Sequence, residues 1–88
     1  MNKKTLKLYV YCQYRIFCGR GNDRDRQTVK EVEEFVHNVP DVITRQILIE
    51  RYINGNTWND VAAAVGSSWD SCRKIAERYL NQSPIDKT

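Results

Sequence analysis

Apolar residues recur at three- and four-residue steps along most of this chain, and this periodicity predicts helices. The clearest stretch is 28–39, in which four valines share one face and Thr28 and Glu31 have the spacing of a capping box. Pro40 ends that helix, because the residue before a proline disfavours helical backbone. Asp41 can cap the next helix. Its inner face is expected to hold Ile43, Ile47, Leu48, Tyr52 and Ile53, with Thr44 outside.

Two further helices are expected at 57–65 and 69–82. Thr57 and Ser68 are of the residue types that cap helix N-termini. Gly66 can end the first of the two helices, because glycine adopts the left-handed conformation without steric cost. The second helix carries apolar residues at helical spacing, namely Cys72, Ile75, Ala76, Tyr79 and Leu80.

These last two helices have the residue types of a helix-turn-helix. That motif needs a small residue where its helices cross and, four places later, a residue that tolerates positive φ. It also needs apolar residues six and nine places after the turn residue, which pack back onto the first helix. The four positions are held by Ala62, Gly66, Cys72 and Ile75, and Val61 and Val65 complete the packing. Residues 57–82 are therefore predicted to form a helix-turn-helix at the end of an all-α fold of about five short helices.

Residues 6–18 fit two patterns. With a period of two, alternate residues share one face, and the β-branched and aromatic content favours a strand. With a helical period, a polar side lies opposite an apolar side that consists of Leu6, Val10, Ile16 and Phe17. No second strand candidate follows, and an unpaired strand would leave its backbone groups unsatisfied, so we expect a helix. Tyr9, Tyr11 and Tyr14 are expected to pack beneath the other helices, with base stacking as the alternative.

Residues 19–27 are expected to form a loop, because two glycines and several charged side chains occur there. The length of 88 residues corresponds to one domain with a modest core. Within it we expect a basic N-terminal helix and loop at 1–26, a helical domain at 27–83 and a tail at 84–88.

The positive charge is concentrated near the N-terminus. Residues 1–26 hold seven Lys or Arg against two Asp, a net charge of +5, whereas residues 27–88 hold seven against nine Asp or Glu, a net charge of −2. A basic arm suits attachment to a polyanion such as the DNA backbone, the alternative being simple solubility. The arm consists of Lys3, Lys4, Lys7, Arg20, Arg24 and Arg26.

Several classes of function lack the residues that they need. The three cysteines are widely spaced and His37 is the one histidine, so no metal site is expected, and the thiols are expected to be reduced in a cytoplasmic protein. No signal peptide and no stretch of about 18 apolar residues is recognised, so no membrane association is expected. No glycine-rich phosphate loop, nucleophile–base pair or pair of metal ligands occurs, so we expect neither an enzyme nor a bound cofactor.

A set of residues between Asp41 and Leu80 matches a known pattern. The matching residues are Arg45, Ile47, Leu48, Arg51, Tyr52, Ile53, Asn54, Gly55, Thr57, Trp58, Val61, Ala62, Gly66, Ser68, Arg73, Lys74 and Ile75. With them the stretch resembles region four of bacterial sigma factors and related small phage regulators, and RYINGNTWNDVA is especially similar to phage late-gene regulators of the ArpU type. The resemblance implies an all-helical fold and control of transcription in phage or prophage genomes. Ser67 departs from the pattern, which has an aliphatic residue there, and Trp69 could fill the gap.

Helix geometry predicts which residues face DNA. With Cys72, Ile75 and Tyr79 turned inward, the open face of the last helix holds Ser68, Trp69, Asp70, Arg73, Lys74, Glu77 and Arg78. The N-terminal part of such a helix enters the major groove, where Arg73 could donate two hydrogen bonds to a guanine. Lys74 and Arg78 are expected to hold phosphates, as is the helix start at Thr57. Asp70 and Glu77 count against DNA contact, because carboxylates repel the phosphate backbone.

The sequence therefore predicts a sequence-specific transcriptional regulator that binds double-stranded DNA with helix 69–82. Because one recognition helix covers only a short site, we also expect a homodimer or a contact with RNA polymerase. The alternative is a protein-interaction module that binds host RNA polymerase or a repressor, which the acidic balance of residues 27–88 favours.

Overall fold

The computed structural model describes residues 3–81, which form helices and short connections with no strand among them. The elements are α1 (Lys3–Lys7), α2 (Tyr9–Phe17), α3 (Asp23–His37), α4 (Val42–Leu48), the π-helical turn η1 (Ile49–Ile53), α5 (Trp58–Val65) and α6 (Trp69–Asn81). The all-α prediction of about five helices is confirmed: the first predicted helix is interrupted at Leu8, and the third ends in η1. The tail predicted at 84–88, and residue 82 of the last predicted helix, lie outside the described residues.

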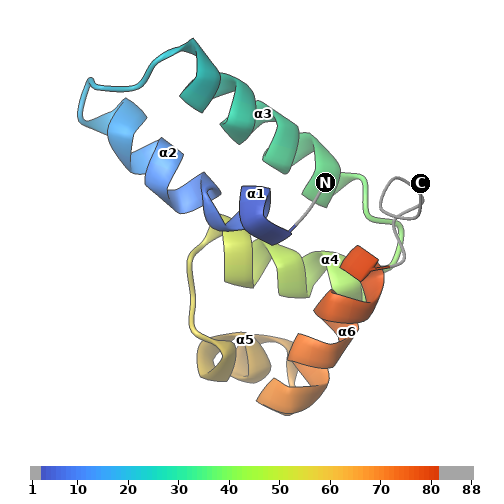
Figure 1. Cartoon of the computed structure of the whole chain (residues 1–88). Coiled ribbons are helices and arrows are strands. Elements are labelled where there is room, and N and C mark those ends of the chain that lie inside the picture. The colour runs from blue at the N-terminus through green and yellow to red at the C-terminus, as the bar shows by residue number, and fades with distance from the viewer. Residues whose placement is uncertain (1–2, 82–88) are drawn as a thin grey trace.

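The helices form two groups that share one core. α2 and α3 are an antiparallel pair, and α4, α5 and α6 pack together below them, with α1 where the two groups meet (Figure 1). The core cluster draws side chains from both groups, including Leu6, Val32, Val36, Ile47, Leu48, Val61 and Cys72. The predicted valine face of α3 is therefore confirmed. No helix in residues 3–81 combines the length and the apolar character needed to cross a membrane.

The loop predicted at 19–27 is wrong in its second half, because α3 begins at Asp23. The capping box is formed by Asn22 and Asp25, not by Thr28 and Glu31. The Asn22 side chain accepts a hydrogen bond from the Asp25 backbone N–H at 2.8 Å, and the Asp25 carboxylate accepts one from the Asn22 N–H at 3.2 Å. Asp23 and Asp25 in the first turn also favour this earlier start, since carboxylates stabilise the positive end of a helix.

The predicted inner faces of two helices need correction. In the first, Leu6, Tyr9 and Cys12 are buried, whereas Val10 and Phe17 are exposed. Tyr9 donates a 2.6 Å hydrogen bond to Glu33, and burial together with this bond raises the pKa of Tyr9 to about 12. The expectation that all three tyrosines are covered is wrong, because Tyr11 and Tyr14 are 57% and 65% exposed.

In the third predicted helix, Thr44 is buried and Ile43 is half-exposed, the reverse of the prediction. Asp41 caps the helix as predicted and explains the difference. Its carboxylate accepts hydrogen bonds from both the backbone N–H and the hydroxyl of Thr44, at 2.8 and 2.7 Å, so the buried hydroxyl is satisfied. These hydrogen bonds also lower the pKa of Asp41.

The capping assignment for α3 can be tested by comparing two substitutions. Asn22→Ala removes the cap and should lower the free energy of unfolding by about 1 kcal/mol. Thr28→Ala lies inside the helix, where alanine is favoured, and should change it by less than about 0.5 kcal/mol. Urea denaturation of the two variants beside the parent chain measures both values. A larger loss for Thr28→Ala than for Asn22→Ala would contradict the observed helix start.

Candidate nucleic-acid interface

α5 and α6 are joined by a tight turn at residues 66–68. Gly66 has φ 72° and ψ 34°, the left-handed conformation predicted for it, and its N–H donates to the Ala62 carbonyl at 2.9 Å. Ser67 donates to the same carbonyl at 3.1 Å. The predicted caps are also present: Thr57 accepts from the Asp60 N–H, and Ser68 accepts from the Ser71 N–H, both at 3.2 Å. These local bonds define the start of both helices and the turn between them.

α6 packs on α4 and α5 through Cys72, Ala76 and Leu80, which are buried. Ile75 and Tyr79, also predicted to face inward, are partly buried at the margin of the core. The Tyr79 ring lies 6.1 Å from that of Phe35, so α3 also holds the C-terminal half of α6. The opposite side of the helix is open to solvent and presents Ser71, Lys74 and Arg78.

Ser71 was missed by the sequence analysis, although it lies on the same exposed line as Lys74 and Arg78. Ser71 lies three residues before Lys74, and residues three apart lie on the same side of a helix. Ser68, by contrast, uses its hydroxyl oxygen as the helix cap and lies 3.0 Å from the Ser71 hydroxyl. Ser71 is therefore added to the candidate DNA-facing residues. Ser68 also caps the N-terminus of α6. Thr57 is exposed at the start of α5 and has the same capping role there.

Arg73 lies against the protein surface. Its guanidinium carbon is 5.5 Å from the centre of the Trp69 ring, and its Nη2 is 3.6 Å from the Asp70 carboxylate. Releasing both contacts costs about 1–2 kcal/mol, the usual strength of an exposed cation–π contact and ion pair. A bidentate guanine contact discriminates between bases by about 1–3 kcal/mol, which is of the same order as this release cost.

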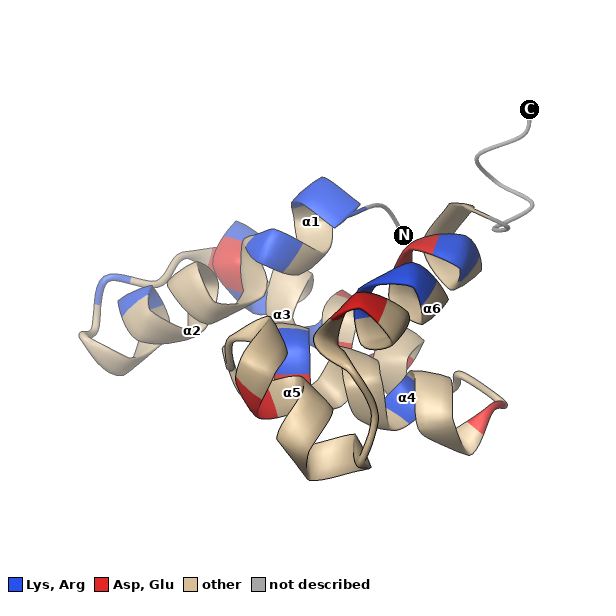
Figure 2. Ribbon diagram, turned by 90° about the horizontal axis from the view of Figure 1, so that it is seen from below, with Lys and Arg blue, Asp and Glu red and all other residues tan. Residues whose placement is uncertain are grey.

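The two carboxylates of this surface are both paired with cations. Asp70 is 3.0 Å from Lys74 and 3.6 Å from Arg73, and Glu77 is 3.1 Å from Lys3. The second pair joins α6 to α1, which lies beside it (Figure 2). The Asp70 pairs can be predicted from helical spacing, since the partners lie three and four residues away. Lys3 and Glu77 are 74 positions apart in the sequence, and only the fold brings them together.

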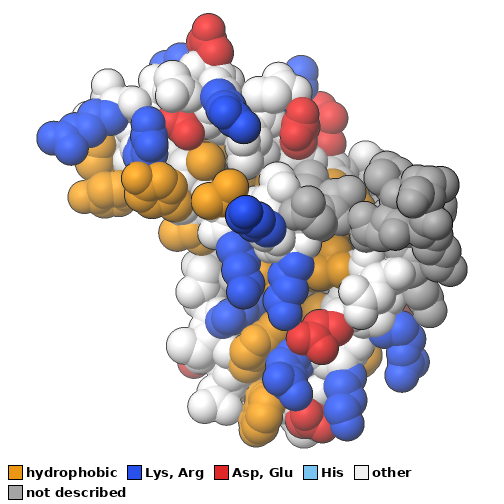
Figure 3. Space-filling view, viewed as in Figure 1, with side chains coloured by type: hydrophobic (Ala, Val, Ile, Leu, Met, Phe, Trp, Pro, Cys, Tyr) orange, Lys and Arg blue, Asp and Glu red, His pale blue; other side chains and the backbone are white. Residues whose placement is uncertain are grey.

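The predicted basic arm divides into two parts. Lys3 lies against α6, and Lys7 lines a surface hollow together with Arg51 of η1. Arg20, Arg24 and Arg26 lie at the opposite end of the molecule, around the α2–α3 connection (Figure 1). In the space-filling view, Lys and Arg side chains form a band across the middle of the face and down its lower part (Figure 3). We call Lys3, Lys7, Arg51, Arg73, Lys74 and Arg78 the α6-side cations.

The start of α5 is held in place by the preceding turn. Arg51 donates to the Asn56 carbonyl at 3.0 Å, and its guanidinium carbon lies 4.9 Å from the centre of the Trp58 ring. Glu50 accepts hydrogen bonds from the Asn54 and Asn56 side chains at 2.8 and 3.3 Å. These contacts tie the end of η1 to the start of α5.

Comparison of the chain with protein-family models, curated proteins and solved structures finds no match. The resemblance to sigma region four rests on the motif residues alone. In residues 3–81, no three His, Cys, Asp or Glu side chains gather closely enough to hold a metal ion.

The turn can be tested through Gly66, because a Cβ there would meet nothing within 4 Å. Gly66→Ala should therefore lower the free energy of unfolding by about 1–2 kcal/mol through backbone strain alone. Gly66→Asn should cost less, since asparagine tolerates this conformation. Gly19 has φ 77° and equally open surroundings, so Gly19→Ala is a matched control with a similar cost. A neutral Gly66→Ala in denaturant titration would show that the turn is not held in this conformation.

Proposed function

We propose that this chain is a sequence-specific DNA-binding regulator of transcription, which reads the major groove with the N-terminal part of α6. The observation that carries the proposal is the arrangement of charged side chains on the exposed α6 surface. Both of its carboxylates are engaged by cations, and Lys74 and Arg78 project from the middle of the open face. The objection from Glu77 is weakened, because Lys3 comes from another helix and offsets its charge. Asp70 offsets one of the two charges of Arg73 and Lys74, so one net positive charge remains on that part of α6.

The residues divide into two roles under this proposal. Ser71 and Arg73, in the first half of α6, would meet base edges, since that half of a recognition helix enters the groove. Phosphates on either side would be met by Lys74, Arg78, Lys3, Lys7 and the start of α5 at Thr57. Trp69, half-exposed beneath Arg73, supports that arginine and offers an apolar edge to a thymine methyl group.

The resemblance to sigma region four and ArpU-type regulators supports this reading and points to a phage or prophage origin and a cytoplasmic site of action. A single recognition helix reads a short sequence, so the proposal includes either a homodimer or assistance from RNA polymerase. The competing function, a module that binds host RNA polymerase or a repressor instead of DNA, is separated from it by the experiment below.

The test is selection from random double-stranded DNA pools at two salt concentrations, with the parent chain and Arg73→Ala, Lys74→Ala. The parent should enrich a defined motif, and the double variant should bind that motif at least about tenfold more weakly with a shallower salt dependence. Arg24→Ala, Lys30→Ala removes the same charge from α3 and should retain the motif. No enrichment, with weak binding that disappears as salt rises, would refute the proposal and favour the protein-interaction module.

A second prediction concerns the Lys3–Glu77 pair. Glu77→Gln removes a carboxylate from the α6 surface and frees Lys3 for a phosphate, so affinity for the selected site should rise by about two- to tenfold at low salt. The gain should fade as salt is added, because exposed charges are screened. Glu31→Gln makes the same charge change on the exposed side of α3 and serves as the control. Equal effects of the two variants in fluorescence anisotropy titrations would exclude a local role for Glu77.

A further inference from the structure

The outward side of α2 carries a stripe of apolar and aromatic side chains. Val10, Tyr11, Tyr14 and Phe17 are exposed to 47%, 57%, 65% and 89%. Val10, Tyr14 and Phe17 follow one another at four- and three-residue steps, so they form a continuous stripe on the helix. We call these four residues the α2 face. Contiguous apolar surface of this kind in a small protein usually marks an interaction site.

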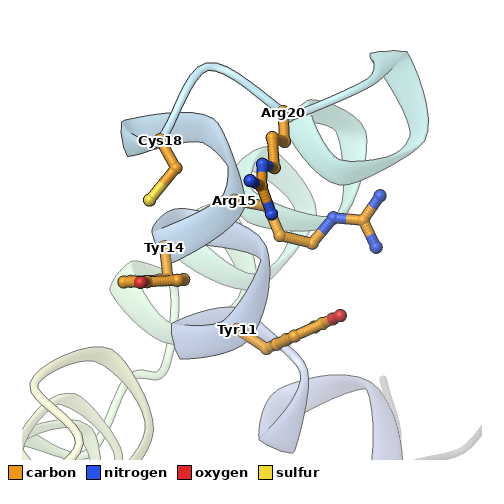
Figure 4. Close-up of a pocket in the computed structure, with 5 residues that line it drawn as sticks. All are labelled: Tyr11, Tyr14, Arg15, Cys18 and Arg20. Atoms are coloured by element: carbon orange, nitrogen blue, oxygen red, sulfur yellow. The ribbon is translucent and has the colours of Figure 1, made fainter.

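The α2 face alternates between projecting rings and hollows. One hollow of about 500 Å³ is lined by Val10, Gln13, Tyr14, Ile16 and Phe17. A second, of about 420 Å³, is lined by Tyr11, Tyr14, Arg15, Cys18 and Arg20, and Figure 4 shows the two tyrosine rings and the Cys18 thiol on successive turns of α2. Neither lining contains a carboxylate. Arg15 is already engaged, 3.1 Å from Asp25 and 5.5 Å from the centre of the Tyr11 ring.

We propose that the α2 face binds the α2 face of a second copy of this chain, with the two helices antiparallel and the twofold axis close to Gln13 and Tyr14. A twofold interface requires a surface that complements itself. Val10 and Phe17, the most exposed ring, lie at equal distances on either side of that axis. Rotation about the axis therefore places each Phe17 against the partner's Val10, so the same apolar contact forms twice.

The exposed rings supply about half of the area that such a dimer needs. A fully exposed aromatic side chain presents about 150–250 Å². At the observed exposures, Tyr11, Tyr14 and Phe17 together offer on the order of 400 Å² of largely apolar surface. A standard interface covers about 800 Å² per partner, so the rings would form its centre and Leu8, Gln13, Ile16 and Arg20 its margin.

The position of the α2 face also favours a second copy. α2 packs against α3 and η1 and lies away from α6, so a dimer formed through it leaves α6 of both copies free (Figure 1). Two recognition helices related by a twofold axis read two half-sites, which supplies the length of contact that one helix lacks. This consequence rests on the proposed function, whereas the dimer itself can be tested without DNA.

The charges at the margin predict an unusual salt dependence. Lys7 and Arg20 lie near opposite ends of α2, so an antiparallel pair brings the Lys7 of one copy toward the Arg20 of the other. Added salt screens this repulsion and leaves the apolar centre unaffected. Association should therefore strengthen as salt rises, whereas an acidic partner segment on the same cations would be released.

The experiment is sedimentation equilibrium of the full chain under reducing conditions, at low and high salt. The parent chain should be a monomer–dimer mixture, and Phe17→Ser should raise the dissociation constant at least about tenfold, as loss of a central aromatic contact does. Val42→Ser replaces a 62% exposed apolar residue on α4 and should have no effect. A parent chain that stays monomeric throughout, or a dimer that weakens in Val42→Ser and not in Phe17→Ser, overturns the proposal.

A thiol cross-link tests the geometry. In a Cys18→Ser background, Gln13→Cys places a thiol close to the proposed axis, and mild oxidation should link two copies. Lys30→Cys in the same background lies on the exposed side of α3 and should stay unlinked. Linking through Lys30→Cys and not through Gln13→Cys would refute the antiparallel arrangement. A dimer that forms as described and binds no DNA refutes the proposed function and leaves this inference standing.

Discussion

Burial of Cys72, Ala76 and Leu80 against α4 and α5 determines which side of α6 faces outward. Because side-chain directions on a helix are coupled, one buried line fixes the place of every other residue on it. Lys74 and Arg78 consequently lie in the middle of the open side, and Glu77 lies on the flank that meets α1. The left-handed turn at Gly66 keeps α6 at the angle that allows this packing, so a single glycine conformation underlies the whole candidate interface.

The electrostatic character of that interface depends on contacts between segments far apart in the sequence. Taken alone, the helix 69–81 has three cations and two carboxylates, which is weak attraction for a polyanion. The fold adds Lys3 at 3.1 Å from Glu77 and sets Lys7 beside Arg51 nearby. A helix of nearly balanced charge thus becomes part of a basic surface. α1 is five residues long and is held by burial of Leu6, so its cations depend on one apolar anchor.

The features that were predicted correctly are those encoded within four residues of one another. The caps at Asp41 and Thr57, the turn at Gly66 and the cap at Ser68 each depend on a short side chain bonding a nearby N–H or on a glycine. The wrong predictions concern which helix side is buried. Val10 and Ile43 are as apolar as Leu6 and Ile47, and only the positions of neighbouring helices decide that the first two are exposed. The start of α3 is different, since two capping-box spacings occur in the sequence, Asn22–Asp25 and Thr28–Glu31, and the helix begins at the first.

Because the molecule is thin, the residue types on the solvent-facing side of each helix are informative. The smallest extent of its backbone is 18 Å, which corresponds to about two layers of helices packed roughly 8–10 Å apart. In a molecule this thin, every helix has one side in solvent unless another chain covers it. α3 fills that side with charged residues, among them Lys30, Glu31 and Glu34, as a solvated helix does. α2 fills it with Val10, Tyr14 and Phe17 instead, although its buried side already holds Tyr9 and Cys12. A helix that is apolar on both sides is typical of a buried position, and α2 acquires such a position only when a second molecule packs against it.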